Sequence, residues 1–162
     1  MTLVSEQIAG VLVTRLEQIA IANGYTFDVV SVDRPNSKAN EWRPRHLSIV
    51  VVQDTTEMNE EVSCPGNPPA CGYDTSYSIH GFVLPSDRST ETYLPQVNAM
   101  ELAIKEAVTQ NDVNWVHFGS LALIAEFGVS EPFLAAEGDN QGVTVPLKVT
   151  YRVNELNQGE VR

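Results

Sequence analysis

Cysteine is almost absent from this 162-residue chain, which contains only two, Cys64 and Cys71. A thioredoxin-type redox pair requires Cys-x-x-Cys at the start of a helix, and this wider spacing excludes it. The spacing also argues against zinc, because structural zinc sites take four ligands and usually include a close Cys-x-x-Cys pair. The nitrogen ligands that remain, His46, His80 and His117, are scattered along the sequence. We therefore interpret His80 as a partly exposed strand residue, and we expect no metal site.

The two cysteines flank a short segment rich in proline and glycine, "CPGNPPAC". A disulfide would require this segment to double back until the two Cα atoms come within about 7 Å. Closing so short a loop would add about 2–2.5 kcal/mol in the chain-entropy treatment. Two free thiols are expected in a reducing cytosol, and the disulfide is the alternative. The proline steps stiffen the segment, which reduces the entropy lost when another surface captures it.

Basic residues are scarce as well, with 10 Lys and Arg against 21 Asp and Glu and a formal net charge of −11. Such a surface repels a phosphate backbone, so tight nucleic-acid binding is not expected. No apolar run approaches the length of a membrane span. A signal peptide is not expected at the start, because a basic first region is lacking and Glu6 and Glu17 interrupt the apolar residues. These absences favour a soluble protein made in a cytosol.

Catalytic motifs are lacking too. The sequence has no phosphate-binding loop and no His-Glu-x-x-His pair. "GVSEP" (residues 128–132) resembles a nucleophile elbow, but the closing glycine and the surrounding αβ unit are missing. "EGDNQG" (residues 137–142) does not have the spacing of a calcium loop and is interpreted as a turn. No convergent set of acid, base and nucleophile can be assembled from these segments.

Two amphipathic helices are present in the pattern. Residues 4–22 and 94–110 carry apolar side chains at spacings of three and four. Ser5 is a candidate N-cap of the first helix, and Asn23 with Gly24 is typical of a helix end. Pro95 is compatible with the second helix, because we expect it to lie in the first turn.

Strand patterns fill the rest of the chain. Residues 47–52 ("LSIVVV") are expected to form a central strand covered on both faces. Residues 143–153 alternate most clearly, and Pro146 predicts an edge or bulged position for this strand because it cannot donate a ladder hydrogen bond. The cysteine segment is expected to be the tip of a long hairpin. The other predicted strands cover residues 26–34, 77–83, 115–118 and 121–127.

The order of these elements, α-β-β-β-α-β-β-β, predicts an α+β domain. We expect a mixed, mainly antiparallel sheet with both amphipathic helices packed on one face and one long hairpin loop. The predicted domain covers residues 1–153. Residues 154–162 are polar and are expected to be a frayed tail.

The order of short segments along the chain is distinctive. An opening helix that ends in "NGY" is followed by "FDVVSVDRP", an apolar strand and an acidic segment. The order continues through "GNPPA", "YSIHGFVLPSD", a second helix and the closing "VPLKVTYRVN". This layout, which covers most of the chain, resembles the tail-terminator (tail-completion, or minor tail) proteins of long-tailed phages. The "GNPPA" loop followed by an aromatic and polar strand and "LPSD" is the most telling part of the resemblance.

The resemblance implies a structural virion protein that is not an enzyme and needs no cofactor. Such proteins form a ring, usually of six copies, that caps the tail tube, stops its polymerisation and presents a surface to the head connector. The implied partners are other copies of the chain, the tail tube protein and the head–tail connector protein, with DNA passing the lumen without specific binding. The implied location is the tail or neck of the virion, after assembly in the host cytoplasm.

A ring also suits features of the residues themselves. The basic stretch "RPNSKANEWRPRH" and the acidic stretch "DTTEMNEE" lie in separate segments, and opposite charges in separate segments suit a head-to-tail contact between copies. Trp42 among arginines could stack on a base, but the net charge favours a protein contact. An edge-like final strand could extend pairing across subunits. The candidate residues for contact with a subunit or the tube are Arg34, Lys38, Trp42, Arg43, Arg45, Cys64, Pro65, Gly66, Asn67, Pro68, Pro69 and Cys71.

Three alternatives stay open at this point. The first is another neck protein, such as a head-closure or connector component. The second is a small metal-binding enzyme domain, which would need convergent polar residues around a pocket. The third is a generic α+β protein-binding module, which shares the physical features and differs only in its partner.

Overall fold

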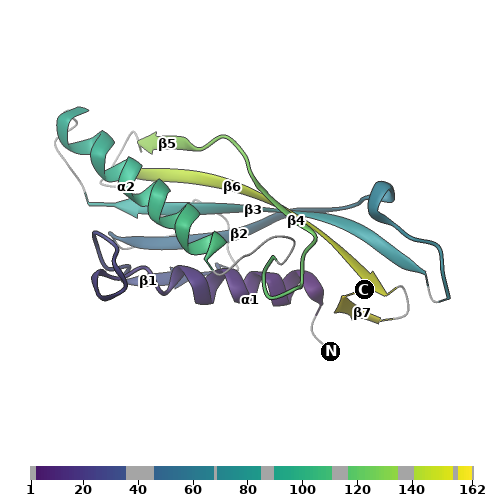
Figure 1. Ribbon diagram of the computed structural model, residues 1–162. Coiled ribbons are helices and arrows are strands. Elements are labelled where there is room, and N and C mark those ends of the chain that lie inside the picture. Colours follow the sequence, from purple (N-terminus) through teal and green to yellow (C-terminus); the bar gives the residue numbers. More distant parts are fainter. Residues whose placement is uncertain are drawn as a thin grey trace.

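The computed structural model describes residues 3–35, 46–67, 69–84, 90–110, 117–134, 141–154 and 157–161. These residues form one seven-stranded sheet with two α-helices lying against one of its faces (Figure 1). The predicted α+β class, the mixed and mainly antiparallel sheet, and the placement of both helices on one face are confirmed. No helix in the described part of the chain is long and apolar enough to cross a membrane.

The central strands are long and the flanking ones are short. The order across the sheet is β1-β2-β3-β6-β4, and β5 and β7 also pair with β6. The pairing of β1 with β2 is parallel, and every other described pairing is antiparallel. The strands are β1 (Ser31–Asp33), β2 (Ser48–Met58), β3 (Ala70–Val83), β4 (Ile124–Phe127), β5 (Glu131–Leu134), β6 (Gln141–Asn154) and β7 (Asn157–Val161).

The first helix, α1 (Val4–Leu16), is shorter than predicted. Leu3 occupies its N-cap position without a side-chain hydrogen bond, so the expectation that Ser5 caps the helix is wrong. Ser5 is instead buried in the first turn. A short 3-10 helix, η1 (Ile21–Asn23), follows, and Gly24 ends it with a left-handed φ of 92°. The predicted stop signal therefore ends η1 and not α1.

The second helix, α2 (Thr90–Thr109), begins four residues before the predicted start at residue 94. Pro95 consequently lies inside the helix, and the expectation that it lies in the first turn is wrong. Proline has no amide hydrogen, so this position gives up one intrahelical hydrogen bond. Pro95 faces outward and is exposed, which leaves its ring clear of the core.

The core lies between the helices and one face of the sheet. Every second residue of β3 and β6 points toward the helices, as strand alternation requires. Gly81 leaves room for the side chain of Met100 from α2 to approach the sheet, since a Cβ there would clash with that side chain. The largest fully buried side chains are Tyr77, Phe118, Ile8, Leu12, Leu16, Ile19, Ile49, Ile79, Met100, Ile104, Leu147 and Val4.

The closing strand β6 is central, which contradicts the edge position predicted from Pro146. It pairs with β3 along its whole length, and β4, β5 and β7 pair with its other side. Pro146 falls between the stretches that pair with β5 and β4. Its carbonyl accepts a hydrogen bond from Gly128 N at 2.9 Å, so its ring nitrogen also faces this gap. The missing donor therefore costs only the return bond to Gly128, just beyond the end of β4, and the pairing of β6 with β3 is complete.

Two other predictions about the sheet are wrong in extent. The strand expected at residues 26–34 is only β1, whereas the strand expected at residues 47–52 continues to Met58. β2 is buried on both faces only in its first part, and its last five residues are exposed. The strand predicted at residues 115–118 lies mostly outside the described residues, and His117 forms an isolated bridge with Ala122.

The expectation of a frayed tail is also wrong for residues 157–161, which form β7. This strand pairs with β6, and Gln7 Nε2 of α1 donates to Gly159 O at 2.9 Å. The end of the described chain is therefore tied to both the sheet and the first helix.

Candidate functional site

The β2–β3 hairpin projects past the end of α1, so its tip has no helix over it (Figure 1). This confirms the prediction that the cysteine segment connects two neighbouring antiparallel strands. A 3-10 helix, η3 (Glu60–Val62), lies in the connection. The tip, defined here as the described residues 59–67 and 69–71, carries most of the predicted contact residues.

Hydrogen bonds from Asn59 and Ser63 hold the tip in one shape. Asn59 N donates to Gly72 O at 2.8 Å, and its side chain accepts from Glu61 N at 3.1 Å. Ser63 Oγ donates to Asn59 O at 3.0 Å and accepts from Gly72 N at 2.9 Å. A stiff loop of this kind loses little conformational freedom on binding, which favours its use as a contact surface.

The tip also folds onto the outer face of the sheet, the face opposite the helices. Arg152 of β6 donates from Nε to Val62 O. Gly72 allows this close approach, because a Cβ there would clash with the Val62 side chain and the Asn59 carbonyl oxygen. η3 is thus seated on β3 and β6, and its position depends on one glycine and one arginine.

The two cysteines are free and lie on opposite faces of the hairpin. Cys64 and Ala70 exchange backbone hydrogen bonds of 2.9 and 3.0 Å, which places their side chains on the same face. Cys71 follows Ala70 in the strand, so its side chain points to the other face, where it packs against the core. This geometry favours the two free thiols over the disulfide alternative.

A polar network centred on Asp74 covers the outer face beside the tip. Asp74 Oδ1 accepts from Thr150 Oγ1 at 2.7 Å and from Asn59 Nδ2 at 3.1 Å. Lys148 Nζ lies 3.9 Å from Asp74 Oδ2 and 3.8 Å from Glu126 Oε2. Among the described residues of this face, carboxylates outnumber cations, with Asp33, Asp54, Glu57, Asp74, Glu126 and Glu131 against Lys148 and Arg152.

His80 lies on the same face, in β3, and is half-buried as predicted for a strand residue. Its Nδ1 is 2.9 Å from Thr144 Oγ1, and its ring packs against Phe133 in a T-shaped arrangement. Burial lowers the pKa of His80, against the opposing charge of Asp54. No group of three or more His, Cys, Asp or Glu side chains in the described ranges is placed to hold a metal ion.

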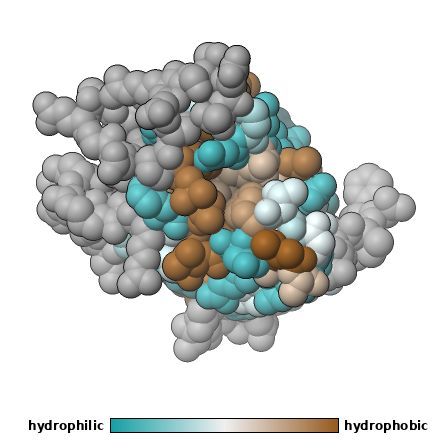
Figure 2. Space-filling model, turned by 90° about the vertical axis from the view of Figure 1, so that its left-hand side faces the viewer, coloured by the Kyte–Doolittle hydropathy of each residue, from teal (hydrophilic) through white to brown (hydrophobic). Residues whose placement is uncertain are grey.

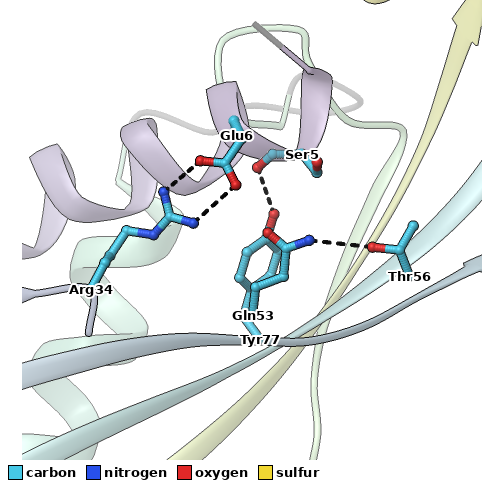
Figure 3. Close-up of polar contacts among 6 residues, drawn as sticks. All are labelled: Ser5, Glu6, Arg34, Gln53, Thr56 and Tyr77. Carbon is cyan, nitrogen blue, oxygen red and sulfur yellow. Dashed lines mark hydrogen bonds and ion pairs between the residues drawn. The ribbon is translucent and has the colours of Figure 1, made fainter. Parts of the chain in front are cut away.

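Arg34, the first of the predicted contact residues, lies away from the tip, at the end of β1. Its guanidinium forms a two-point ion pair with Glu6 of α1, at 2.8 and 3.2 Å (Figure 3). The structure therefore does not bring Arg34 together with the tip. Lys38, Trp42, Arg43, Arg45 and Pro68 lie outside the described residues.

A separate apolar groove of about 320 Å³ lies at the opposite end of the molecule, where α2 meets the end of β3. Figure 2 shows this end, with apolar side chains gathered among polar ones. The groove supplies no ionisable group for catalysis. Its described lining is Thr26, Phe27, Leu47, Val83, Leu84, Pro95, Gln96, Ala99 and Met100.

The residues that hold the tip in place were not predicted from the sequence. Asn59, Ser63, Asp74 and Arg152 are ordinary surface residue types, and only the register of β2, β3 and β6 brings them together. The alternation of polar residues in β3 and β6 was the one available signal, because it indicated a polar face. A scan against known protein families finds no match to this chain, and a search of curated proteins finds no relative of significant similarity.

Proposed function

We propose that this chain is a structural virion protein that acts as the tail terminators of long-tailed phages do. Copies of the chain would form a ring, of six subunits, on the end of the tail tube, where the ring stops polymerisation and offers a surface to the head–tail connector. Its location would be the neck of the virion, after assembly in the host cytoplasm. This role needs neither catalysis nor a cofactor.

The observation that carries the proposal is the projecting, hydrogen-bonded tip at the end of the β2–β3 hairpin. It projects past the helices and is held by backbone and side-chain hydrogen bonds, so it is shaped before any partner arrives. In a head-to-tail ring, one surface of each subunit fits a different surface on the next. The tip supports the proposal as one such surface, with its exposed residues Pro65, Gly66 and Asn67 as the contact candidates.

The polar outer face suits the lumen of such a ring. Carboxylates outnumber cations on its described residues, and several of them are held by neighbouring side chains. A surface of this charge repels the phosphate backbone, so DNA could pass without being retained. The central position of β6 excludes this strand as a route for sheet pairing between subunits, because both of its sides are already paired.

Assembly of the purified full chain tests this proposal. Light scattering after size exclusion, at several protein concentrations, should give a ring mass, and the protein should shorten tubes grown from the tail tube protein of the same phage. Asn67→Lys should reduce tube capping, whereas Asn98→Lys, the same change on the exposed face of α2, should not. A strict monomer that also leaves tube length unchanged would contradict the proposal. A ring seen by cryo-electron microscopy away from the tube end would assign the chain to another neck position.

A further inference from the structure

Strand β2 continues far beyond its parallel neighbour. β2 has 11 residues and β1 has 3, and their pairing ends where Asp33 meets Val50. Arg34 then turns toward α1 to meet Glu6, and Pro35 follows. No described strand lies beside the rest of β2 on this side, and residues 54–58 are exposed.

Every second residue of this part of β2 directs its backbone N–H and C=O groups away from β3, toward the side where no described strand lies. Asn59 N donates to Gly72 O, so Asn59 faces β3. Backbone N–H and C=O groups alternate between the two sides of a strand, so Glu57 also faces β3 while Thr56 and Met58 face the open side. Met58 is 61% exposed, which shows that the strand here is accessible. An extended segment could therefore add to the sheet at this edge.

A polar groove continues the line of β1 along the same edge. It measures about 610 Å³ and is lined by Glu6, Arg34 and Pro35 on one side and by residues 51–54 of β2 on the other. Figure 3 shows the Arg34–Glu6 pair standing beside β2. An added strand lies about 4.8 Å from its neighbour, so it would enter this groove.

The charge of the edge indicates what could bind there. Arg34 is already neutralised by Glu6, whereas Asp54 and Glu57 carry negative charge along the strand, and Glu60 and Glu61 follow at the tip. A second β2 edge would bring like charges opposite one another, which disfavours pairing between two copies of this strand. The bulge between Gln53 and Thr56 further restricts which strands can pair in register. An extended segment that carries lysine or arginine would be attracted to Asp54 and Glu57 and would avoid this repulsion.

We propose that the open edge of β2, from residue 51 to Met58, binds an extended segment of a partner protein that carries lysine or arginine. The segment adds to the sheet as a strand, bonding to the backbone of Thr56 and Met58, and its basic side chains lie beside Asp54 and Glu57. This recognition mode combines main-chain affinity with side-chain selectivity. It stands on the β2 edge alone and does not require the chain to form a ring.

A pair of synthetic peptides tests this site on the full-length protein. The first is a labelled ten-residue peptide in which lysine alternates with threonine, and the second has glutamate in place of lysine. Fluorescence anisotropy should show binding of the lysine peptide only. Hydrogen–deuterium exchange should slow in fragments covering residues 51–58 when the lysine peptide is bound, with no comparable change in α2.

Matched charge reversals separate a local site from general attraction to an acidic protein. Glu57→Lys should weaken binding of the lysine peptide about threefold to tenfold. Glu17→Lys makes the same change in net charge beyond the end of α1 and should alter binding less than twofold. Equal effects of the two variants, protection away from β2, or no binding of the lysine peptide would each overturn the proposal.

Discussion

Arg34 and Glu6 join the end of β1 to the first turn of α1 through two hydrogen-bonded contacts, Nη1 to Oε2 at 2.8 Å and Nη2 to Oε1 at 3.2 Å. The hydrogen bond from Arg34 lowers the pKa of the Glu6 carboxyl. Beneath this pair, Tyr77 OH donates to the backbone carbonyl of Ser5 at 2.8 Å, and burial raises the pKa of the Tyr77 phenol (Figure 3). Together these contacts fix the start of α1 over the middle of the sheet.

We expect Glu6→Gln to lower the free energy of unfolding by about 0.5 kcal/mol at pH 7, because the ion pair is partly exposed and solvent screens it. The lowered pKa means that the folded state holds the proton more weakly than the unfolded chain. The stabilisation by the Arg34–Glu6 ion pair is therefore fully present above the pKa that Glu6 has in the unfolded chain. It is lost as the pH falls through the lower pKa of Glu6 in the folded state. Urea unfolding of both proteins should show a difference at pH 7 that closes in acid.

Glu17→Gln is the control for this measurement, since no ion pair is described for Glu17. Its free energy of unfolding in urea should equal that of the wild type both at pH 7 and in acid. A Glu6→Gln difference that stayed constant into acid would mean that the substitution acts through packing, not through charge.

A comparison of two glycines tests the seating of η3. Gly72→Ala places a Cβ against Val62 and the Asn59 carbonyl oxygen, so it should displace the tip and lower the free energy of unfolding by about 1–3 kcal/mol. Gly10→Ala makes the same change in α1 at a position with nothing within 4 Å, and should raise stability by about 1 kcal/mol. Thermal unfolding and limited proteolysis at the tip measure both effects. A Gly72→Ala protein as stable and as protease-resistant as the wild type would contradict the described contact.

His80 should make stability depend on pH below neutrality. Burial lowers its pKa below the ordinary value of 6.5, so the unfolded chain binds a proton where the folded one does not. The titration of His80 therefore does not reduce the free energy of unfolding above about pH 6.5. Below this pH the free energy of unfolding falls as the pH drops toward the lowered pKa. His80→Asn removes the titrating group, and its urea midpoint should change less than that of the wild type between pH 7.5 and 5.5. Parallel profiles for the two proteins would show that His80 does not contribute.

The pattern of apolar residues was sufficient to predict the class of the fold. Spacings of three and four located α1 and α2, and the alternation in residues 143–153 located β6. The errors arose where a local rule met a tertiary context. Pro146 predicts an edge because it cannot donate a ladder hydrogen bond, but its nitrogen faces the break between β4 and β5, so β6 still pairs with β3 along its whole length.

The candidate site could be predicted only in outline. The proline and glycine content of residues 65–69 indicated a projecting turn, and the strands on either side confirmed it. The contacts that seat the tip join residues far apart in sequence, such as Arg152 with Val62, and no local pattern encodes them. The open edge of β2 was missed because its threonine and acidic residues dilute the apolar signal on which strand prediction depends.

The placement of the two cysteines gives a final prediction about oxidation. Because Cys64 shares a face with Ala70 and Cys71 points to the other face, a disulfide would require the tip to unfold from its hydrogen bonds. Native protein exposed to mild oxidant should keep both thiols, which thiol titration after denaturation would count. Cys64→Ser should have little effect on stability, whereas Cys71→Ser should lower it, because Cys71 packs against the core and a hydroxyl there loses its hydrogen bonds to water. Rapid formation of an intramolecular disulfide in the native state would show that residues 64–71 adopt a different arrangement from the one described.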